Sequence, residues 1–267
     1  RYVMADVRNA MSGSHAADGV ALEPCGDGVW RAPGACIVDR TGRKRLPIGF
    51  GAFDAVGRDS VWVDKTRLIA DVLDSGYSVT LFCRPRRFGK TLNLTMMKSF
   101  LEIPTDGRDR APMFVDTDIW QNGNGCYRQY QGAFPVIHLS MLAAKGLTWH
   151  MTYAALVNMI VDEYTRHHYL LDSGALTENE REYFLRIESR RAPEGDYLSS
   201  LQQLLVFLNR YHQRPVVVLI DEYDAPIMAA YSAPDGGYYN QAVAFLKSWL
   251  TGTLKGSGDI MAFACLT

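Results

Sequence analysis

The residues whose types and spacing are best suited to binding or catalysis form an arginine-rich turn, Arg84 to Thr91, with the sequence RPRRFGKT. A phosphate-binding loop needs a buried strand, then a turn whose backbone N–H groups point inward, then a helix whose N-terminus faces the anion. In that geometry Gly89 allows close approach of the backbone, Lys90 reaches the β- and γ-phosphates, and the Thr91 hydroxyl binds Mg²⁺. The turn therefore predicts a site for a nucleoside triphosphate.

The turn departs from the usual GxxxxGK[ST] pattern, because Arg84 stands where that pattern has its first glycine. The alternative to a phosphate site is a strand, a turn and a helix with an incidental lysine. The side chains of Arg84, Arg86 and Arg87 fit three roles: phosphate ligands, nucleic-acid contacts or surface charge. The sequence leaves all three open.

A pair of acidic residues, Asp221 and Glu222, follows the apolar run 216–220 (VVVLI). Ligands bind at the carboxyl edge of the sheet in open α/β folds. Asp221 is expected to hold Mg²⁺, directly or through water, and Glu222 to act as the general base that orients the attacking water. A capped strand end is the alternative for the pair alone. Together with the turn, the pair predicts a P-loop nucleoside triphosphatase with an added strand between the two motifs.

The elements that must position these residues alternate between short apolar strands and amphipathic helices. Strands are predicted over 78–83, 134–140, 216–220 and 260–266. Helices are predicted from 90, after a cap at Thr148, after a capping box of Thr177 and Glu180, over 198–208 and over 243–250. The run 216–220 is apolar on both faces, which is typical of a strand inside a covered parallel sheet. The order predicts an α/β fold in three layers, with a central parallel sheet flanked by helices.

Residues 1–45 are expected to form a partly irregular N-terminal extension, with segments 28–30 and 35–38 as a hairpin or an edge strand. Its last part, 40–45, carries a short basic run, for which a nucleic-acid contact and a solvated linker are the two interpretations. Residues 46–267 are expected to be the P-loop domain. Because the last predicted strand ends next to Thr267, the domain is expected to be truncated there.

The composition excludes several classes of protein. The 267 residues are 48% hydrophobic and 21% charged with a formal net charge of -1, which excludes wholesale disorder and a globally basic nucleic-acid binder. No apolar run reaches the roughly 18–20 residues of a membrane span, and the first residues lack a secretory signal. The five cysteines are scattered, without metal-ligand spacing, and Cys83 and Cys265 fall in apolar runs. We expect buried, reduced thiols in a cytoplasmic protein.

Four segments follow one another in an order that resembles the prokaryotic AAA-ATPase-like family. They are Leu46–Gly49 (LPIG), Val63–Thr66 (VDKT), Arg84–Thr91 (RPRRFGKT) and Leu219–Pro226 (LIDEYDAP). The likeness extends over about 220 residues, from Leu46 to the last residue. Arginine in place of the first loop glycine is that family's own pattern, so the departure no longer counts against a phosphate site.

The resemblance implies an AAA-related P-loop ATPase domain. From the two motifs that follow strands, we expect this domain to bind ATP and Mg²⁺ and to hydrolyse ATP slowly, as the regulatory or motor part of a larger protein. The alternative is a nucleotide-binding switch or interaction module without significant turnover. Relatives often continue into a domain similar to the PD-(D/E)xK nucleases, through which nucleic acid would be a partner. No such domain is seen in these residues, and a homo-oligomer is a further expectation.

The resemblance also implies which residues contact the nucleotide. It extends the phosphate site over the whole turn, Arg84, Pro85, Arg86, Arg87, Phe88, Gly89, Lys90 and Thr91. It places Asp64 and Lys65 near the nucleotide, with a salt-bridged helix start as the alternative. Lys90 and Glu222 carry the catalytic roles, and Thr91 and Asp221 carry the metal roles. Thr267 stands where such domains carry a polar sensor, and no arginine finger can be named.

Overall fold

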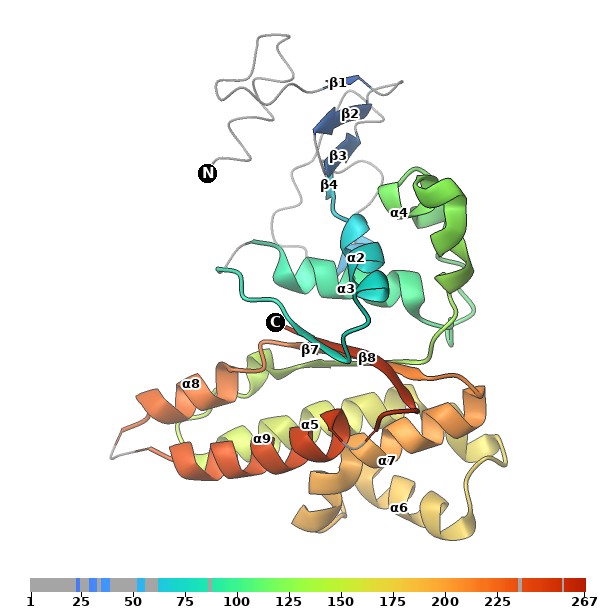
Figure 1. Ribbon diagram of the computed structural model, residues 1–267. Coiled ribbons are helices and arrows are strands. Elements are labelled where there is room, and N and C mark those ends of the chain that lie inside the picture. The colour runs from blue at the N-terminus through green and yellow to red at the C-terminus, as the bar shows by residue number, and fades with distance from the viewer. Residues whose placement is uncertain are drawn as a thin grey trace.

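The computed structural model describes residues 23–24, 29–32, 35–38, 52–55, 62–85, 88–234, 237–255 and 257–267. Within these residues the chain forms two four-stranded sheets (Figure 1). One sheet is antiparallel and lies toward the N-terminus. The other is parallel and lies between two groups of helices, so the chain has the α/β fold that the sequence predicts.

The parallel sheet joins strands that are far apart in the sequence. Its order is β5 (Val79–Leu81), β8 (Met261–Leu266), β7 (Val216–Asp221) and β6 (Val136–Ser140). All three neighbouring pairs are parallel. One strand, β8, therefore lies between β5, which leads into the arginine-rich turn, and β7, which ends at the acidic pair. The carboxyl ends of these strands share one edge of the sheet.

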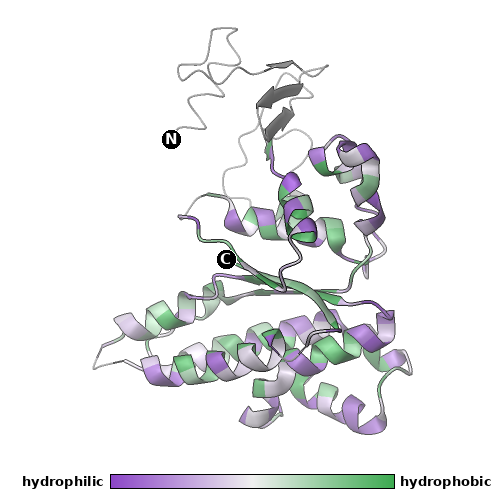
Figure 2. Cartoon of the chain, in the orientation of Figure 1, coloured by the Kyte–Doolittle hydropathy of each residue, from purple (hydrophilic) through white to green (hydrophobic). Residues whose placement is uncertain are grey.

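Strand β7 is buried along its whole length, which explains its run of apolar residues. Val218 and Ile220 belong to the larger core with the lower helices of Figure 1, whereas Val217 and Leu219 belong to the core with the upper helices. Because successive side chains of a strand point to opposite faces, only an apolar run can serve both cores. In Figure 2 the central strands are coloured as hydrophobic and the helices carry mixed colours.

Helices cover both faces of the parallel sheet (Figure 1). The upper face carries α2 (Arg67–Ser75), α3 (Lys90–Leu101) and α4 (Asp118–Gln121). The lower face carries α5 (Trp149–Arg166), α6 (Glu178–Glu188), α7 (Glu194–His212), α8 (Ala225–Ser232) and α9 (Tyr239–Leu254). Short 3-10 helices are η1 (Phe53–Ala55), η2 (Ala111–Met113), η3 (Gly123–Tyr130), η4 (Met141–Ala143) and η5 (His168–Asp172). Among the described residues, no helix combines the length and apolarity that a membrane crossing requires.

Two predicted helix starts are confirmed. The Thr148 hydroxyl accepts a hydrogen bond from the Met151 N–H and caps α5. Thr177 and Glu180 form a reciprocal capping box at the start of α6. Each satisfies backbone N–H groups that have no partner within the helix. These local signals fix where the lower helices begin.

The antiparallel sheet has the order β1 (Glu23–Pro24), β2 (Val29–Ala32), β3 (Ala35–Val38) and β4 (Trp62–Asp64). Strands β2 and β3 pair as a hairpin, as predicted for this part of the extension. Strand β4 leads directly to α2, so this sheet is joined to the upper helices. The basic run at 40–45 lies outside the described residues.

The prediction of buried thiols is wrong for part of the chain. Strand β5 ends at Leu81, before the predicted end of that strand, so Cys83 falls in the loop that follows and is exposed. Cys126 is exposed as well, and only Cys265 of these three is buried. Burial raises the pKa of the Cys265 thiol to about 12. The side chains of Cys25 and Cys36 lie outside the described residues.

Candidate functional site

The N-terminus of α3 is open to an anion. Gly89 precedes the helix with a φ of 75°, a left-handed backbone conformation that glycine adopts without strain. No side chain caps this helix start, and its first turn has no acidic residue. A carbon added at Gly89 would lie 3.9 Å from Lys65 Nζ, so the backbone of the turn directly faces a cation. Free N–H groups and the helix dipole both favour negative charge here.

Asp221 links this helix to the carboxyl edge of the sheet. Its carboxylate is buried and accepts a hydrogen bond of 2.7 Å from the Thr91 hydroxyl on α3. Its other oxygen accepts a hydrogen bond from the Thr267 hydroxyl, at the end of β8. The structure therefore brings together Thr91 and Asp221, which the sequence assigns to one metal. A hydroxyl and a carboxylate are oxygen ligands of the kind that Mg²⁺ prefers, with its remaining positions filled by phosphates and waters.

Glu222 follows Asp221 in an unusual backbone conformation. Its φ is 54°, which is left-handed and strained for a residue with a side chain. The neighbouring Tyr223 N–H donates to the Thr267 carbonyl at 3.1 Å, and the Thr267 N–H donates to the Ile220 carbonyl at 2.9 Å. Thr267 thus holds the chain on both sides of the acidic pair. Strained residues of this kind cluster at functional sites, where the surrounding structure maintains them.

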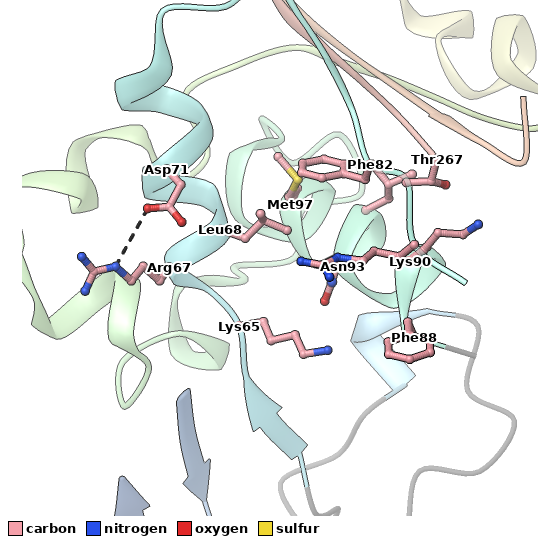
Figure 3. A pocket seen from close by; sticks show the side chains of 12 residues that line it. Lys65, Arg67, Leu68, Asp71, Phe82, Phe88, Lys90, Asn93, Met97 and Thr267 are labelled. Atoms are coloured by element: carbon pink, nitrogen blue, oxygen red, sulfur yellow. Dashed lines mark ion pairs between the residues drawn. The ribbon is translucent and has the colours of Figure 1, made fainter. Parts of the chain in front are cut away.

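A pocket of about 420 Å³ adjoins the N-terminus of α3 (Figure 3). Three cationic side chains line it, Lys65, Arg84 and Lys90, and none of them forms an ion pair with the described residues. A fourth, Arg67, is paired with Asp71 at 3.9 Å, as the dashed line of Figure 3 marks. Unpaired cations around one pocket attract an anionic ligand.

Asp64 takes a different position from Lys65, its neighbour in the predicted site. Its buried carboxylate accepts hydrogen bonds from the backbone N–H of Thr66 at 2.8 Å and of Asp118 at 2.6 Å. Burial raises the pKa of Asp64, although these hydrogen bonds act in the opposite direction. Asp64 does not line the pocket and instead ties the start of α2 to the start of α4.

The rest of the predicted turn is only partly placed. Phe88 lines the pocket and is 57% exposed, and Pro85 is exposed in the loop before it. Arg86 and Arg87 lie outside the described residues. Thr91, Asp221 and Glu222 do not line the pocket, but Thr267 does, and its hydroxyl connects the pocket to Asp221.

Sequence reasoning missed the residues that complete the pocket. These are Arg67, Leu68, Asp71, Phe82, Asn93, Leu94 and Met97. A signal existed for three of them, since Asn93, Leu94 and Met97 stand three, four and seven residues after Lys90 and so share its face of the helix. No local pattern indicated that Leu68 of α2 or Phe82 would face them. Among the described residues, no cluster of three or more His, Cys, Asp or Glu side chains forms a metal site.

Comparison with known proteins identifies the family to which the residues of this site belong. The family model described as "Predicted AAA-ATPase" matches residues 47–267. No curated protein and no solved structure gives a match. The matched range includes α3, the acidic pair and every described residue of the pocket. The chain belongs to the family of predicted AAA-ATPases.

Proposed function

We propose that this chain binds ATP with Mg²⁺ at the N-terminus of α3 and hydrolyses it slowly. The observation that carries the proposal is the hydrogen bond from Thr91 to Asp221, which joins two residues 130 positions apart. It places the end of the arginine-rich turn against the acidic pair. A metal–triphosphate site needs this juxtaposition, because the same ion must contact the phosphates and the protein.

The architecture supports assigning the domain to the three-layer P-loop class. The strand before the turn and the strand before the acidic pair are separated by β8 and end at the same edge. That edge is where open α/β sheets bind ligands. In this assignment the backbone of Gly89 and Thr91 surrounds the β-phosphate, and Lys90 neutralises the β- and γ-phosphates.

Thr91 and Asp221 are the residues that would hold Mg²⁺, which supplies charge neutralisation at the γ-phosphate when it is bound. Thr267 orients the Asp221 carboxylate through its hydroxyl. Glu222 accepts a proton from the attacking water, as a general base one residue beyond the metal ligand. Its strained backbone, fixed by the hydrogen bonds of Thr267, directs the residue away from the regular path of β7.

The cations of the pocket complete the phosphate site in this proposal. Lys65 and Arg84 approach the phosphates from the α2 side and from the loop after β5. Asp64 contributes indirectly, because its two backbone hydrogen bonds fix the chain that carries Lys65. Phe88 shields the mouth of the pocket, and Arg86 and Arg87 are assigned to the phosphates through the turn alone.

Binding is tested by calorimetric titration of ATP–Mg²⁺ into the parent protein and Lys90→Ala. Loss of a charge that contacts two phosphates is expected to weaken binding by about tenfold or more, because hydrogen bonds to charged groups contribute about 1.5–3 kcal/mol. Lys247→Ala is the matched control, because Lys247 is exposed on α9. If both variants bind as tightly as the parent, the phosphate assignment is wrong.

Hydrolysis is tested separately with Glu222→Gln, which keeps the shape of the side chain but removes the base. We expect nucleotide affinity to be retained and steady-state phosphate release to fall by roughly 10²–10⁴. If the parent releases no phosphate above background, the alternative of a nucleotide switch without turnover is favoured. Equal turnover in parent and variant excludes Glu222 as the base.

A further inference from the structure

The pocket beside the phosphate site continues along one face of α3. Lys90, Asn93 and Met97 line it, and their spacing places them on one stripe of the helix. At about 1.5 Å per residue, Met97 lies roughly 10 Å further along the helix than Lys90. A ligand held by its phosphates at the helix start therefore has room to extend along the first turn, as far as Asn93. The volume of about 420 Å³ falls within the range of small-molecule sites.

The far part of the pocket is apolar. Leu68 of α2 and Phe82, which follows β5, are partly exposed in this wall, and Leu94 and Met97 of α3 adjoin it as almost fully buried side chains. Figure 3 shows Phe82 and Met97 together with Leu68 next to them, away from the ammonium groups of Lys65 and Lys90. The pocket thus has a cationic part and an apolar part. A nucleotide has the same division, with charged phosphates at one end and the flat faces of a base at the other.

One uncharged polar side chain lies between the two parts. Asn93 is half-buried, lines the pocket and forms no side-chain hydrogen bond with the described residues. Its amide offers one acceptor and two donor hydrogens in one plane. Such an amide pairs in two places with adenine, accepting from the 6-amino group and donating to N7. Guanine presents two acceptors at the same edge, which an asparagine amide cannot match.

We propose that the wall of Leu68 and Phe82 receives the base of the nucleotide and that Asn93 selects adenine over guanine by pairing with its 6-amino group and N7. This inference rests on the proposed function, because the phosphates must lie at the start of α3 for the base to reach Asn93. It goes beyond that function by naming the residue that determines base specificity.

The test compares the affinities of ATP and GTP for the parent, Asn93→Ala and Asn158→Ala. Asn158 is exposed in the middle of α5, so its variant controls for replacing a helical asparagine by alanine. We expect the parent and the control to prefer ATP by about 5-fold to 150-fold, which is the discrimination that a bidentate pair provides. Asn93→Ala is expected to bind the two nucleotides within about twofold of each other. Its thermal unfolding, measured alongside, shows that the fold is retained.

A modified ligand identifies the contact itself. The analogue 7-deaza-ATP lacks the N7 acceptor, so the parent should bind it several-fold more weakly than ATP, whereas Asn93→Ala should bind both alike. An unchanged ATP preference in Asn93→Ala, or equal sensitivity of both proteins to 7-deaza-ATP, overturns the inference. Lys90→Ala distinguishes a wrong role for Asn93 from a wrong position of the phosphate site. If Lys90→Ala still weakens ATP binding, the phosphate site stands and only the role of Asn93 is wrong.

Discussion

A cluster of buried charges beneath α3 allows a quantitative prediction of how one substitution changes the free energy of unfolding. Arg166, in the last turn of α5, donates to Glu163 at 2.6 and 3.0 Å and also to Glu102, the residue that follows α3 as its C-cap. Lys98 pairs with the second oxygen of Glu102 at 3.2 Å. Two cations thus balance two carboxylates that are each about 5% exposed. This buried ion cluster anchors the end of α3 opposite the proposed phosphate site.

Replacing Arg166 by methionine keeps much of the apolar stem but leaves Glu163 without its cation. Breaking a buried pair in this way costs about 3–5 kcal/mol, because an uncompensated charge remains inside. With a urea m-value of about 3 kcal/mol/M, the unfolding midpoint should fall by about 1–1.7 M. Arg210→Met is the matched control. Its pair with Glu180, at 2.7 Å, lies between partly exposed side chains and should contribute only about 0–1 kcal/mol.

The pH dependence of this loss distinguishes a charge effect from lost packing. Burial alone would raise the pKa of Glu163, but the charge of Arg166 and the hydrogen bonds of His167 and Arg166 outweigh it and hold the pKa below its ordinary value. In the parent, Glu163 therefore stabilises the fold at pH values above the pKa that this side chain has in the unfolded chain. In Arg166→Met burial dominates, the pKa rises, and the penalty is largest at neutral pH.

The expected result is a difference in unfolding free energy between parent and Arg166→Met that is about 3–5 kcal/mol at pH 7 and clearly smaller near pH 4. Urea unfolding at both pH values, followed by circular dichroism, gives that difference. A loss below about 1 kcal/mol at pH 7 would show that the pair has little net effect. A loss that is equal at both pH values would show that packing, rather than charge, is responsible.

Three further predictions concern separate parts of the chain. Glu222→Gly should raise the free energy of unfolding by about 1 kcal/mol, because glycine adopts the φ of 54° without strain, and should abolish turnover, because the carboxylate is removed. A variant less stable than the parent would show that the backbone at Glu222 is not strained. Burial and the neighbouring His167 lower the pKa of His212 to about 4. As pH decreases, His212 is therefore protonated in the unfolded state before it is protonated in the folded state, so the free energy of unfolding should fall between about pH 6.5 and pH 4. His212→Gln should reduce that slope in urea titrations, and an unchanged slope would exclude this histidine. Thr177→Ala should lower the melting temperature through the loss of a capping box that contributes about 1 kcal/mol, and an unchanged melting temperature would show that the cap is not needed.

The elements whose signals are local were predictable from the sequence. The apolar run of β7, the cap of Thr148 and the start of α3 after Gly89 each depend on a few neighbouring residues. The order of the sheet is different, because β8, which lies between β5 and β7, follows both motifs in the sequence, whereas β6, which lies between the motifs in the sequence, is at the edge.

The parts that could not be predicted depend on contacts between distant segments. Asp64 stands beside Lys65 at the end of β4, yet its carboxylate accepts a hydrogen bond from the backbone N–H of Asp118, 54 residues away. Leu68 and Phe82 line the pocket only because α2 and the loop after β5 pack beside α3. Cys83 is exposed because β5 is shorter than its apolar run. In each case tertiary packing decides which of several locally acceptable environments a residue occupies.

The most direct measurement for the central claim is a structure of this chain determined with Mg²⁺ and a non-hydrolysable ATP analogue. We predict phosphate density over the backbone N–H groups of Gly89, Lys90 and Thr91, with the metal between the Thr91 hydroxyl and the Asp221 carboxylate. Density for the base is predicted against Phe82. Nucleotide bound elsewhere, or phosphates without contact to Lys90, would contradict the proposed ATP site.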